Sequence, residues 1–257
     1  MLKNNNYNDY SKDIFEKSIK YCKGVGSRYA NILAKKNIFT VYDLITFFPR
    51  TYEDRRKILS ISEAFKNKGN NSVILAEVIN IAAFVYRFRK KPLLIVSDGE
   101  TMCEVPIYSG ALPKDISKGD KIYITGKFVR GNKEKVQCRM IEMEKPSSNS
   151  TSYGKIIPIY PLTEGLSQRK LRNLIVNELI TFEKNMKYDI PSIIKNKYRL
   201  KNFVSSVMEM HFPISFEALE EARESLVFEE FLTFQYIHLS ERRPNILIKE
   251  KRYNSFD

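Results

Sequence analysis

The stretch Ser72–Phe88, SVILAEVINIAAFVYRF, is the clearest indication of the fold of this chain, because it is a long run of β-branched and aromatic residues, which favour a strand. Shorter stretches of the same kind follow it: Pro92–Asp98, Met102–Tyr108, Asp120–Arg130 and Lys135–Met143. Turn sequences separate them, namely Asp98-Gly99, Lys118-Gly119-Asp120 and Gly131-Asn132. The pattern predicts five strands, which suit a small closed barrel.

The segment between the third and fourth of these stretches favours one type of barrel. Residues 109–119, SGALPKDISKG, contain apolar residues in a turn-rich context, where a five-stranded OB-fold barrel places a short helix or loop. We therefore predict an α+β chain in three consecutive parts. These are an N-terminal helical segment (1–60), an OB-fold β-barrel (61–146), and a linker with a C-terminal helical connector (147–257).

The segments on either side of the barrel have the apolar spacing of helices. Residues 11–48 predict short helices around the turn Lys23-Gly24-Val25-Gly26. The polar stretch 146–154, PSSNSTSYG, predicts a flexible linker or a loop tip after the fifth strand. Beyond it, Ser167 is placed to cap a helix from residue 168 to about residue 183. A longer helix is predicted for residues 215–241, with Pro244 as its stop.

The charge of the chain points to a polyanion as its partner. The 257 residues carry a formal net charge of +13, and the sequence pI is about 9.5. The excess is local: residues 84–139 contain 12 Lys and Arg against 6 Asp and Glu, whereas residues 140–257 contain 17 against 16. We therefore expect a nucleic-acid interface on the central strands, and a solvated helical scaffold in the C-terminal part.

Motifs for catalysis or metal binding are absent from the sequence. It contains neither a GxxxxGK[ST] phosphate loop nor a G-x-S-x-G elbow. Cys22, Cys103 and Cys138 form no CxxC pair, and with only two histidines they indicate neither a zinc site nor a disulfide framework. Acidic residues such as Glu229 and Glu230 are predicted to lie on a solvated helix face. We expect no catalysis by this chain alone, and no cofactor or metal.

Membrane-spanning and secretory segments are also missing from the sequence. Its longest apolar stretch, Val73–Tyr86, is interrupted by Glu77 and Asn80 and falls short of the ~20 residues of a membrane-spanning helix. The N-terminus has neither the apolar core of a secretory signal nor the Arg-rich amphipathic pattern of a transit peptide. The sequence predicts a cytoplasmic location and no membrane partner.

The strongest candidate for a binding site is the end of the first strand with the turn that follows it. The residues there are Phe84, Val85, Tyr86, Arg87, Phe88, Arg89, Lys90 and Lys91. Rings that alternate with cations suit stacking on bases, which contributes about 1–3 kcal/mol per base, together with contacts to phosphates. The alternative is that the rings of Phe84, Tyr86 and Phe88 share one strand face and fill the barrel.

Two further groups are candidates for contact with a phosphate backbone. The first is a basic stretch on the fourth and fifth strands and their turn: Lys127, Arg130, Lys133, Lys135 and Arg139. Its alternative role is simple solvation. The second group is Gly24, Gly26 and Arg28, where glycines at the start of a helix let the backbone approach a phosphate. The alternative there is a structural turn that needs glycine only for a positive φ.

Several stretches together resemble one known family. They are KGVGSRYANILAKKNIFTVYDLITFFPRTYEDRR, VSDGE, KGDKIYITGKF, PIYPLTEGLSQRKLRNLI, MHFP and EEARESLVFEEFLTFQ. In this order they are similar to landmarks in the N-terminal region of RecG, the bacterial ATP-dependent helicase of branched DNA. The resemblance extends from about residue 20 to residue 242, and PIYPLTEGLSQRKLR is its specific part.

The resemblance implies that the barrel is a wedge domain, an OB fold that sits on a replication fork or Holliday junction and splits its arms. It places the wedge tip, where aromatic side chains stack on exposed base pairs, at Phe84–Lys91. Phe84 and Phe88 are the first choice for these rings, followed by Tyr86. Branched DNA is the partner that the resemblance implies, and DNA repair, recombination and fork regression are the processes.

RecG proteins continue into two motor domains with a Walker A loop, and this sequence contains neither. A fragment, a truncated or split reading frame and a stand-alone fork-binding product all remain open. ATP and Mg²⁺ are implied only where a motor segment, from the same or a separate reading frame, supplies their site. The competing function is that of a stand-alone OB-fold protein that binds single-stranded DNA or RNA without helicase activity.

Overall fold

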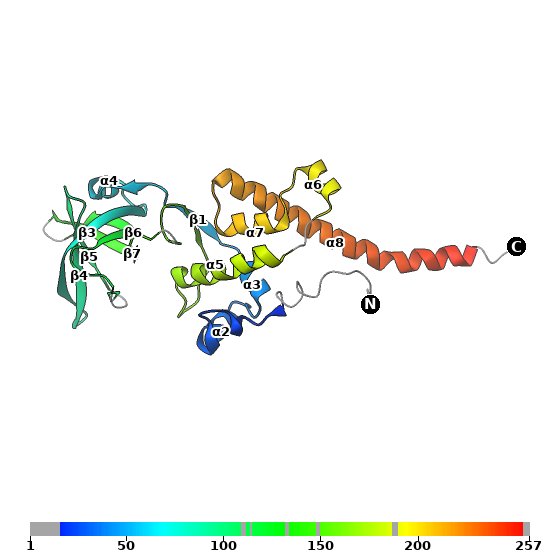
Figure 1. Cartoon of the computed structure of the whole chain (residues 1–257), viewed down its shortest axis with the longest axis horizontal. Helices are drawn as coiled ribbons and strands as arrows, with labels where there is room; N and C mark the ends of the chain where they lie inside the picture. The colour runs from blue at the N-terminus through cyan, green and yellow to red at the C-terminus, as the bar shows by residue number, and fades with distance from the viewer. Residues whose placement is uncertain are drawn as a thin grey trace. The chain divides into compact units, whose positions relative to one another are not determined.

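The computed structural model describes residues 16–108, 112–113, 115–131, 134–147, 150–186 and 190–253, with side chains up to residue 240. The chain separates into two compact units, residues 51–159 and residues 1–50 together with 160–257 (Figure 1). We call them the barrel unit and the helical unit. Their limits differ from the three consecutive parts predicted above, because helices from before and after the barrel bury their apolar faces in one common core.

The helical unit contains a 3-10 turn and six helices in its described part. Short polar caps set where several of them begin. Thr40 and Asp43 form a capping box at the start of α3, and the Ser167 side chain accepts a hydrogen bond from the backbone of Lys170 in α5, as predicted. The elements are η1 (Ile19–Tyr21), α2 (Gly26–Ala34), α3 (Val41–Ile45), α5 (Gln168–Asn185), α6 (Ser192–Tyr198), α7 (Phe203–His211) and α8 (Phe216–Tyr253).

Helix α8 is longer than the sequence pattern predicts. It continues through Pro244, so the prediction that this proline stops the helix was wrong (Figure 1). A proline inside a helix removes one backbone hydrogen bond and crowds the preceding turn, at roughly 3 kcal/mol. Glu241, Arg242 and Arg243 before it and Leu247 after it are good helix formers, so the helix resumes on its far side.

In the barrel unit, six strands form one sheet in the order β2-β3-β4-β5-β7-β6. An additional pairing of β3 with β6 joins the two sides of this sheet. Strands β3 to β7 are the five that the sequence predicts, and the short β2 adds to β3 in parallel. Their bounds are β2 (Ile58–Leu59), β3 (Ser72–Tyr86), β4 (Arg89–Ser97), β5 (Met102–Pro106), β6 (Lys121–Arg130) and β7 (Val136–Glu144).

The inner face of this sheet holds the core of the barrel unit. Ile74, Leu94, Val105 and Ile124, each from a different strand, are completely buried there. Helix α4 (Ile61–Lys66) also contributes, and its first backbone N–H is held by the Asp98 carboxylate in the turn after β4, at 2.7 Å. In the sequence VSDG, the Asp98 side chain therefore anchors the start of α4 to the turn after β4.

A separate two-stranded sheet pairs β1 (Thr51–Asp54) with β8 (Ile156–Ile159) at the edge of the barrel unit. Next to it the buried guanidinium of Arg55 donates to Glu142 and to the carbonyl of Ser152, both at 2.9 Å. Residues 150–152 are buried as well. In its described residues the stretch 146–154 is thus a packed loop after β7 and not a flexible linker.

Candidate nucleic-acid interface

The end of the β3–β4 hairpin is a two-stranded ribbon. Residues 72–77 of β3 pair with β6, but residues 80–86 pair only with β4. On the β4 side, pairing with β5 begins at Leu93. Residues 84–91 therefore leave the body of the sheet, which is why side chains that are apolar in the sequence are exposed here. Val85 is 71% exposed.

The register assigns each ribbon side chain to a face. Residues directly opposite each other in antiparallel strands point to the same side, and neighbours along a strand alternate. Leu94 of β4 points into the core, so Lys91 lies on the outer face together with its partner Phe84. Tyr86 and its partner Arg89 lie on the same outer face. The alternative in which these rings fill the barrel is wrong, since none of them belongs to the buried core.

The tip of the hairpin is a two-residue turn made of Arg87 and Phe88, whose φ angles are 47° and 63°. Both residues are in the left-handed region, as a type I′ turn requires, although such turns strongly favour Asn and Gly. A bulky aromatic residue there is strained, at about 1–3 kcal/mol. The strained turn holds the ring of Phe88 at the apex, fully exposed at 103% of its reference area.

A third ring completes an aromatic cluster at the base of the ribbon. Tyr108, two residues beyond β5, lies edge-on to Phe84 at 5.6 Å and to Tyr86 at 4.9 Å between ring centroids. Phe84 and Tyr86 are 6.5 Å apart. We call Phe84, Tyr86 and Tyr108 the outer ring cluster. Tyr108 was not among the residues predicted from the sequence, because it is 22 positions from Tyr86 and meets it only through strand pairing.

The cations of the ribbon have no acidic partner in the described part of the chain. The guanidinium of Arg87 lies over the ring of Tyr86, at 5.3 Å from its centroid. Arg89, Lys90 and Lys91 form no ion pair with any described carboxylate. Their positive charge is therefore available to a polyanion. Lys90 faces away from the rings with its partner Val85, so cations lie on both faces of the ribbon.

The second basic group is partly neutralised. Arg130 pairs with Glu134 at 3.2 Å and Lys135 with Glu104 at 2.7 Å. Lys133 lies outside the described residues. Lys127 of β6 and Arg139 of β7 are both exposed and directly opposite each other. Like charges in such a cross-strand pair destabilise a sheet. Neither side chain forms an ion pair with a carboxylate in the described residues, so the pair is a positive spot on β6 and β7.

The glycine turn in the helical unit has the conformation that its sequence predicts. Gly24 and Gly26 have φ angles of 82° and 57°, and α2 begins at Gly26 without a side-chain cap. A side chain at position 24 would meet the amine of Lys170 at 3.1 Å, and this amine also lies 4.8 Å from the ring centroid of Tyr29. With Arg28 on the first turn of α2, cations surround a helix start, which suits a phosphate as well as a structural turn.

Comparison with known proteins decides the family. The family model of the RecG wedge domain matches residues 18–182, which include the glycine turn at Gly24, all strands from β1 to β8 and most of α5. This chain belongs to the RecG wedge family. Curated RecG proteins agree: "ATP-dependent DNA helicase RecG" of Borreliella burgdorferi is 32% identical over 95% of this chain, and that of Thermotoga maritima is 30% identical over 84%. The resemblance drawn from the sequence is confirmed.

A solved structure of RecG bound to a three-way DNA junction has a similar fold. It superimposes on 94% of this chain with a TM-score of 0.70 at 25% sequence identity. The match covers 35% of that protein, and the two curated RecG relatives are covered to 36% and 28%. The chain thus spans about a third of the length of the RecG proteins that it matches.

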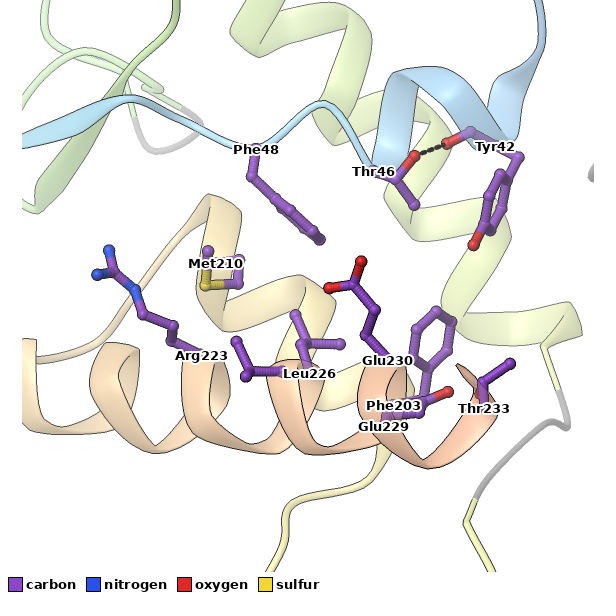
Figure 2. Close-up of a pocket in the computed structure, with 11 residues that line it drawn as sticks. Tyr42, Thr46, Phe48, Phe203, Met210, Arg223, Leu226, Glu229, Glu230 and Thr233 are labelled. Atoms are coloured by element: carbon purple, nitrogen blue, oxygen red, sulfur yellow. Dashed lines mark hydrogen bonds between the residues drawn. The ribbon is translucent and has the colours of Figure 1, made fainter. Parts of the chain in front are cut away.

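The helical unit has a cavity of about 520 Å³ between α3, α7 and α8. Of these helices, α7 and α8 lie outside residues 18–182, which match the RecG wedge model. Figure 2 shows the carboxylate of Glu230 extending from α8 into it, between Phe48 and Tyr42. Glu229 is buried beside this cavity, so the prediction of a solvated position was wrong for this residue: α8 turns this part of its surface toward the neighbouring helices. Burial and the nearby Glu229 raise the pKa of Tyr42. These carboxylates repel phosphate and exclude the cavity from a nucleic-acid interface.

The described residues contain neither a reactive thiolate nor a cluster of metal ligands. Burial raises the pKa of the Cys22 and Cys103 thiols to about 12 and that of Cys138 further, so all three stay protonated. Within the described residues, no group of three His, Cys, Asp or Glu side chains is placed to hold a metal ion. None of the described helices is both long enough and apolar enough to cross a membrane.

Proposed function

We propose that this region binds branched DNA and that the β3–β4 ribbon is the part that enters the junction. One observation carries the proposal: a fully exposed Phe88 is held by a strained turn at the tip of a ribbon whose cations have no described acidic partner. An exposed ring among free cations is unfavourable in water alone but suits a surface that offers both bases and phosphates.

The cations and the aromatic ring of the ribbon have different roles in binding. Arg87, Arg89, Lys90 and Lys91 attract the phosphates of the separated strands, a contact that carries no sequence information. Phe88 stacks on the base pair at the branch point, where a pair has one open face. Recognition is therefore by shape, charge and stacking. Lys127 and Arg139 extend the positive surface along β6 and β7, whereas Arg130 and Lys135 are already paired with carboxylates. The turn at Gly24, Gly26 and Arg28 adds a phosphate contact from the helical unit.

In a complete protein this wedge would direct an ATP-dependent helicase in fork regression, repair and recombination. The support is the family and the curated relatives, which are named as ATP-dependent helicases. ATP and Mg²⁺ would be held by motor domains, from the same chain or from a separate one, and the wedge itself would perform no chemical step. We further propose that the closed part of the sheet, β3 to β7, is an OB-fold barrel, because its strand order and the β3–β6 pairing fit that topology.

Titration of the 257-residue chain with a three-way junction and with a plain duplex of equal length tests the proposal. We expect tighter binding to the junction, and a loss of about tenfold in junction affinity for Phe88→Ala, since one stacked base contributes about 1–3 kcal/mol. Phe231→Ala removes an equally large ring that is 65% exposed on α8, and it serves as the matched control. Equal affinity of the wild-type chain for the two DNAs would contradict the proposal.

The competing function, binding of any single strand including RNA, is favoured by the outer ring cluster, since every base has a face that can stack. Competition of the bound junction with a structured RNA and with unpaired DNA distinguishes the two. A junction specialist retains the junction in equimolar competitor, whereas a general single-strand binder exchanges it for the unpaired strand.

A further inference from the structure

Tyr108 is part of the ribbon although it belongs to another segment of the chain. Strand β5 pairs Leu93 with Pro106, and the backbone N–H of Ile107 then donates to the carbonyl of Pro92 at 3.0 Å, so the pairing continues past the end of the strand. Ile107 points into the core. Tyr108 therefore points outward, to the same side as Lys91 and Phe84.

The three rings of the outer ring cluster are not equally accessible. Phe84 is half-buried between the other two rings. Tyr86 is 36% exposed, and the guanidinium of Arg87 lies over its ring. Tyr108 is the most exposed of the three, at 43%, and within the described residues no cation lies over it. It is the ring of this cluster that a ligand reaches first.

The two faces of the ribbon are chemically different. The outer face carries the ring cluster with Arg89 and Lys91 beside it, whereas the opposite face carries Ala83, Val85 and Lys90. Strands that part at Phe88, as proposed above, would leave along opposite sides of the ribbon, and only one of them would meet the aromatic rings. A base within a duplex has both faces covered by its neighbours, and it can stack on a side chain only after it is unpaired.

We propose that the outer ring cluster is a second binding site, at which Tyr108 stacks on an unpaired base of one of the two separated DNA strands. The site rests on the proposed function, because it needs the tip to part the strands, and it makes the wedge asymmetric. Lys91 and Arg89 neutralise the phosphates of the retained strand. Phe84 and Tyr86 are positioning residues that hold the ring of Tyr108 edge-on.

Fluorescence of 2-aminopurine tests this asymmetry with the complete 257-residue chain. Two forks are prepared, each with 2-aminopurine at the first unpaired position of one strand or of the other. Stacking quenches 2-aminopurine, so we expect the wild-type chain to quench one fork through Tyr108 and Tyr108→Leu to lose that quenching only. The same variant is expected to bind a fork with unpaired arms at least about fivefold more weakly, the lower end of the stacking range.

Two variants separate stacking from folding. Leucine keeps an apolar side chain against Phe84 and Tyr86, and Tyr108→Phe keeps the aromatic face, so Tyr108→Phe is expected to restore both quenching and affinity. Tyr236→Leu, at a tyrosine that is 66% exposed on α8, is the matched control. If Tyr108→Leu keeps wild-type quenching and affinity, or loses quenching equally in both strands, the second site does not exist. If the wild-type chain does not prefer the fork to a duplex, the proposed function fails first.

Discussion

The hydroxyl of Tyr160 lies 2.8 Å from Nδ1 of His211 in the core of the helical unit, and Nε2 of the same ring lies 2.7 Å from the carbonyl oxygen of Ile45. A carbonyl oxygen only accepts, so Nε2 carries the hydrogen and donates it, while Nδ1 accepts from Tyr160. The neutral ring thereby satisfies both partners. Burial lowers the pKa of His211 to about 4, and its hydrogen bond to Ile45 opposes this only in part.

The helical unit is therefore expected to lose stability as the solution is acidified. The pKa of His211 is lower in the folded state than its ordinary value of 6.5, so the unfolded chain takes up this proton first. The stabilisation is complete above about pH 6.5 and is lost between there and pH 4, with about 2 kcal/mol lost at pH 5. Urea unfolding followed by helical circular dichroism at pH 7 and pH 5 measures the loss.

Two variants show whether His211 causes this pH dependence. His211→Gln can donate to Ile45 and accept from Tyr160 but does not titrate, and it is expected to flatten the dependence. His238→Gln removes an exposed histidine on α8 and should leave it unchanged. An unaltered slope in His211→Gln would assign the pH dependence to other groups.

The strained turn at the tip is expected to lower the stability of the fold while it supports DNA binding. Replacing Arg87 by Asn and Phe88 by Gly installs residues that a type I′ turn favours, and should raise the free energy of unfolding by about 1–3 kcal/mol. The same double variant removes the apical ring, so its junction affinity should fall at least as far as that of Phe88→Ala. Thermal unfolding and junction titration on one preparation measure both effects. A destabilised double variant would show that the turn is not strained.

The cross-strand pair of Lys127 and Arg139 should also oppose folding while it supports binding. Arg139→Thr removes one of two like charges that face each other on β6 and β7, and is expected to stabilise the barrel unit by a few tenths of a kcal/mol up to about 1 kcal/mol. If the pair contacts DNA, the slope of log affinity against log salt should decrease by about one. An unchanged slope would place this pair outside the interface, and Arg130→Thr, at a cation already paired with Glu134, is the matched control.

Gly126 is expected to tolerate no side chain. It lies at the β-bulge between β6 and β7, and a Cβ atom there would be 2.5 Å from the carbonyl oxygen of Arg139 and 2.7 Å from Sγ of Cys138. Gly126→Ala should therefore lower the free energy of unfolding by more than about 2 kcal/mol through overpacking. Gly119→Ala, at a positive φ but with open space around it, should lower it by only about 1 kcal/mol. Equal losses in the two variants would argue against the clash.

Patterns among neighbouring residues were sufficient to predict most secondary-structure elements and the exposed tip of the β3–β4 hairpin. The β-branched and aromatic run of β3, the cap at Ser167 and the turn sequences depend on neighbours a few positions away. The five predicted strands and the start of α5 appear near their expected bounds, whereas α8 extends beyond its predicted end. Phe88 was also identified correctly as an exposed ring, because charged neighbours on both sides cannot be buried with it.

The flexible-linker alternative for residues 146–154 and the solvated position predicted for Glu229 both failed because a distant segment changes the environment of these residues. Residues 150–152 have a linker-like composition, yet they are buried because Arg55, nearly a hundred positions earlier, donates to the carbonyl of Ser152. Glu229 has a solvated pattern but is covered by neighbouring helices. Neither contact leaves a trace in local periodicity.

The order and type of most elements, the excess of positive charge and the family can be inferred from the amino-acid sequence alone, since each of them depends on residues that are close together in the chain. The three-dimensional structure was needed to show that helices from before and after the barrel share one core, which face of the ribbon carries the rings, and that Tyr108 joins them. The physical reason is that strand register and helix packing bring together residues far apart in the chain, and a one-residue change of register would reverse every side chain on the ribbon.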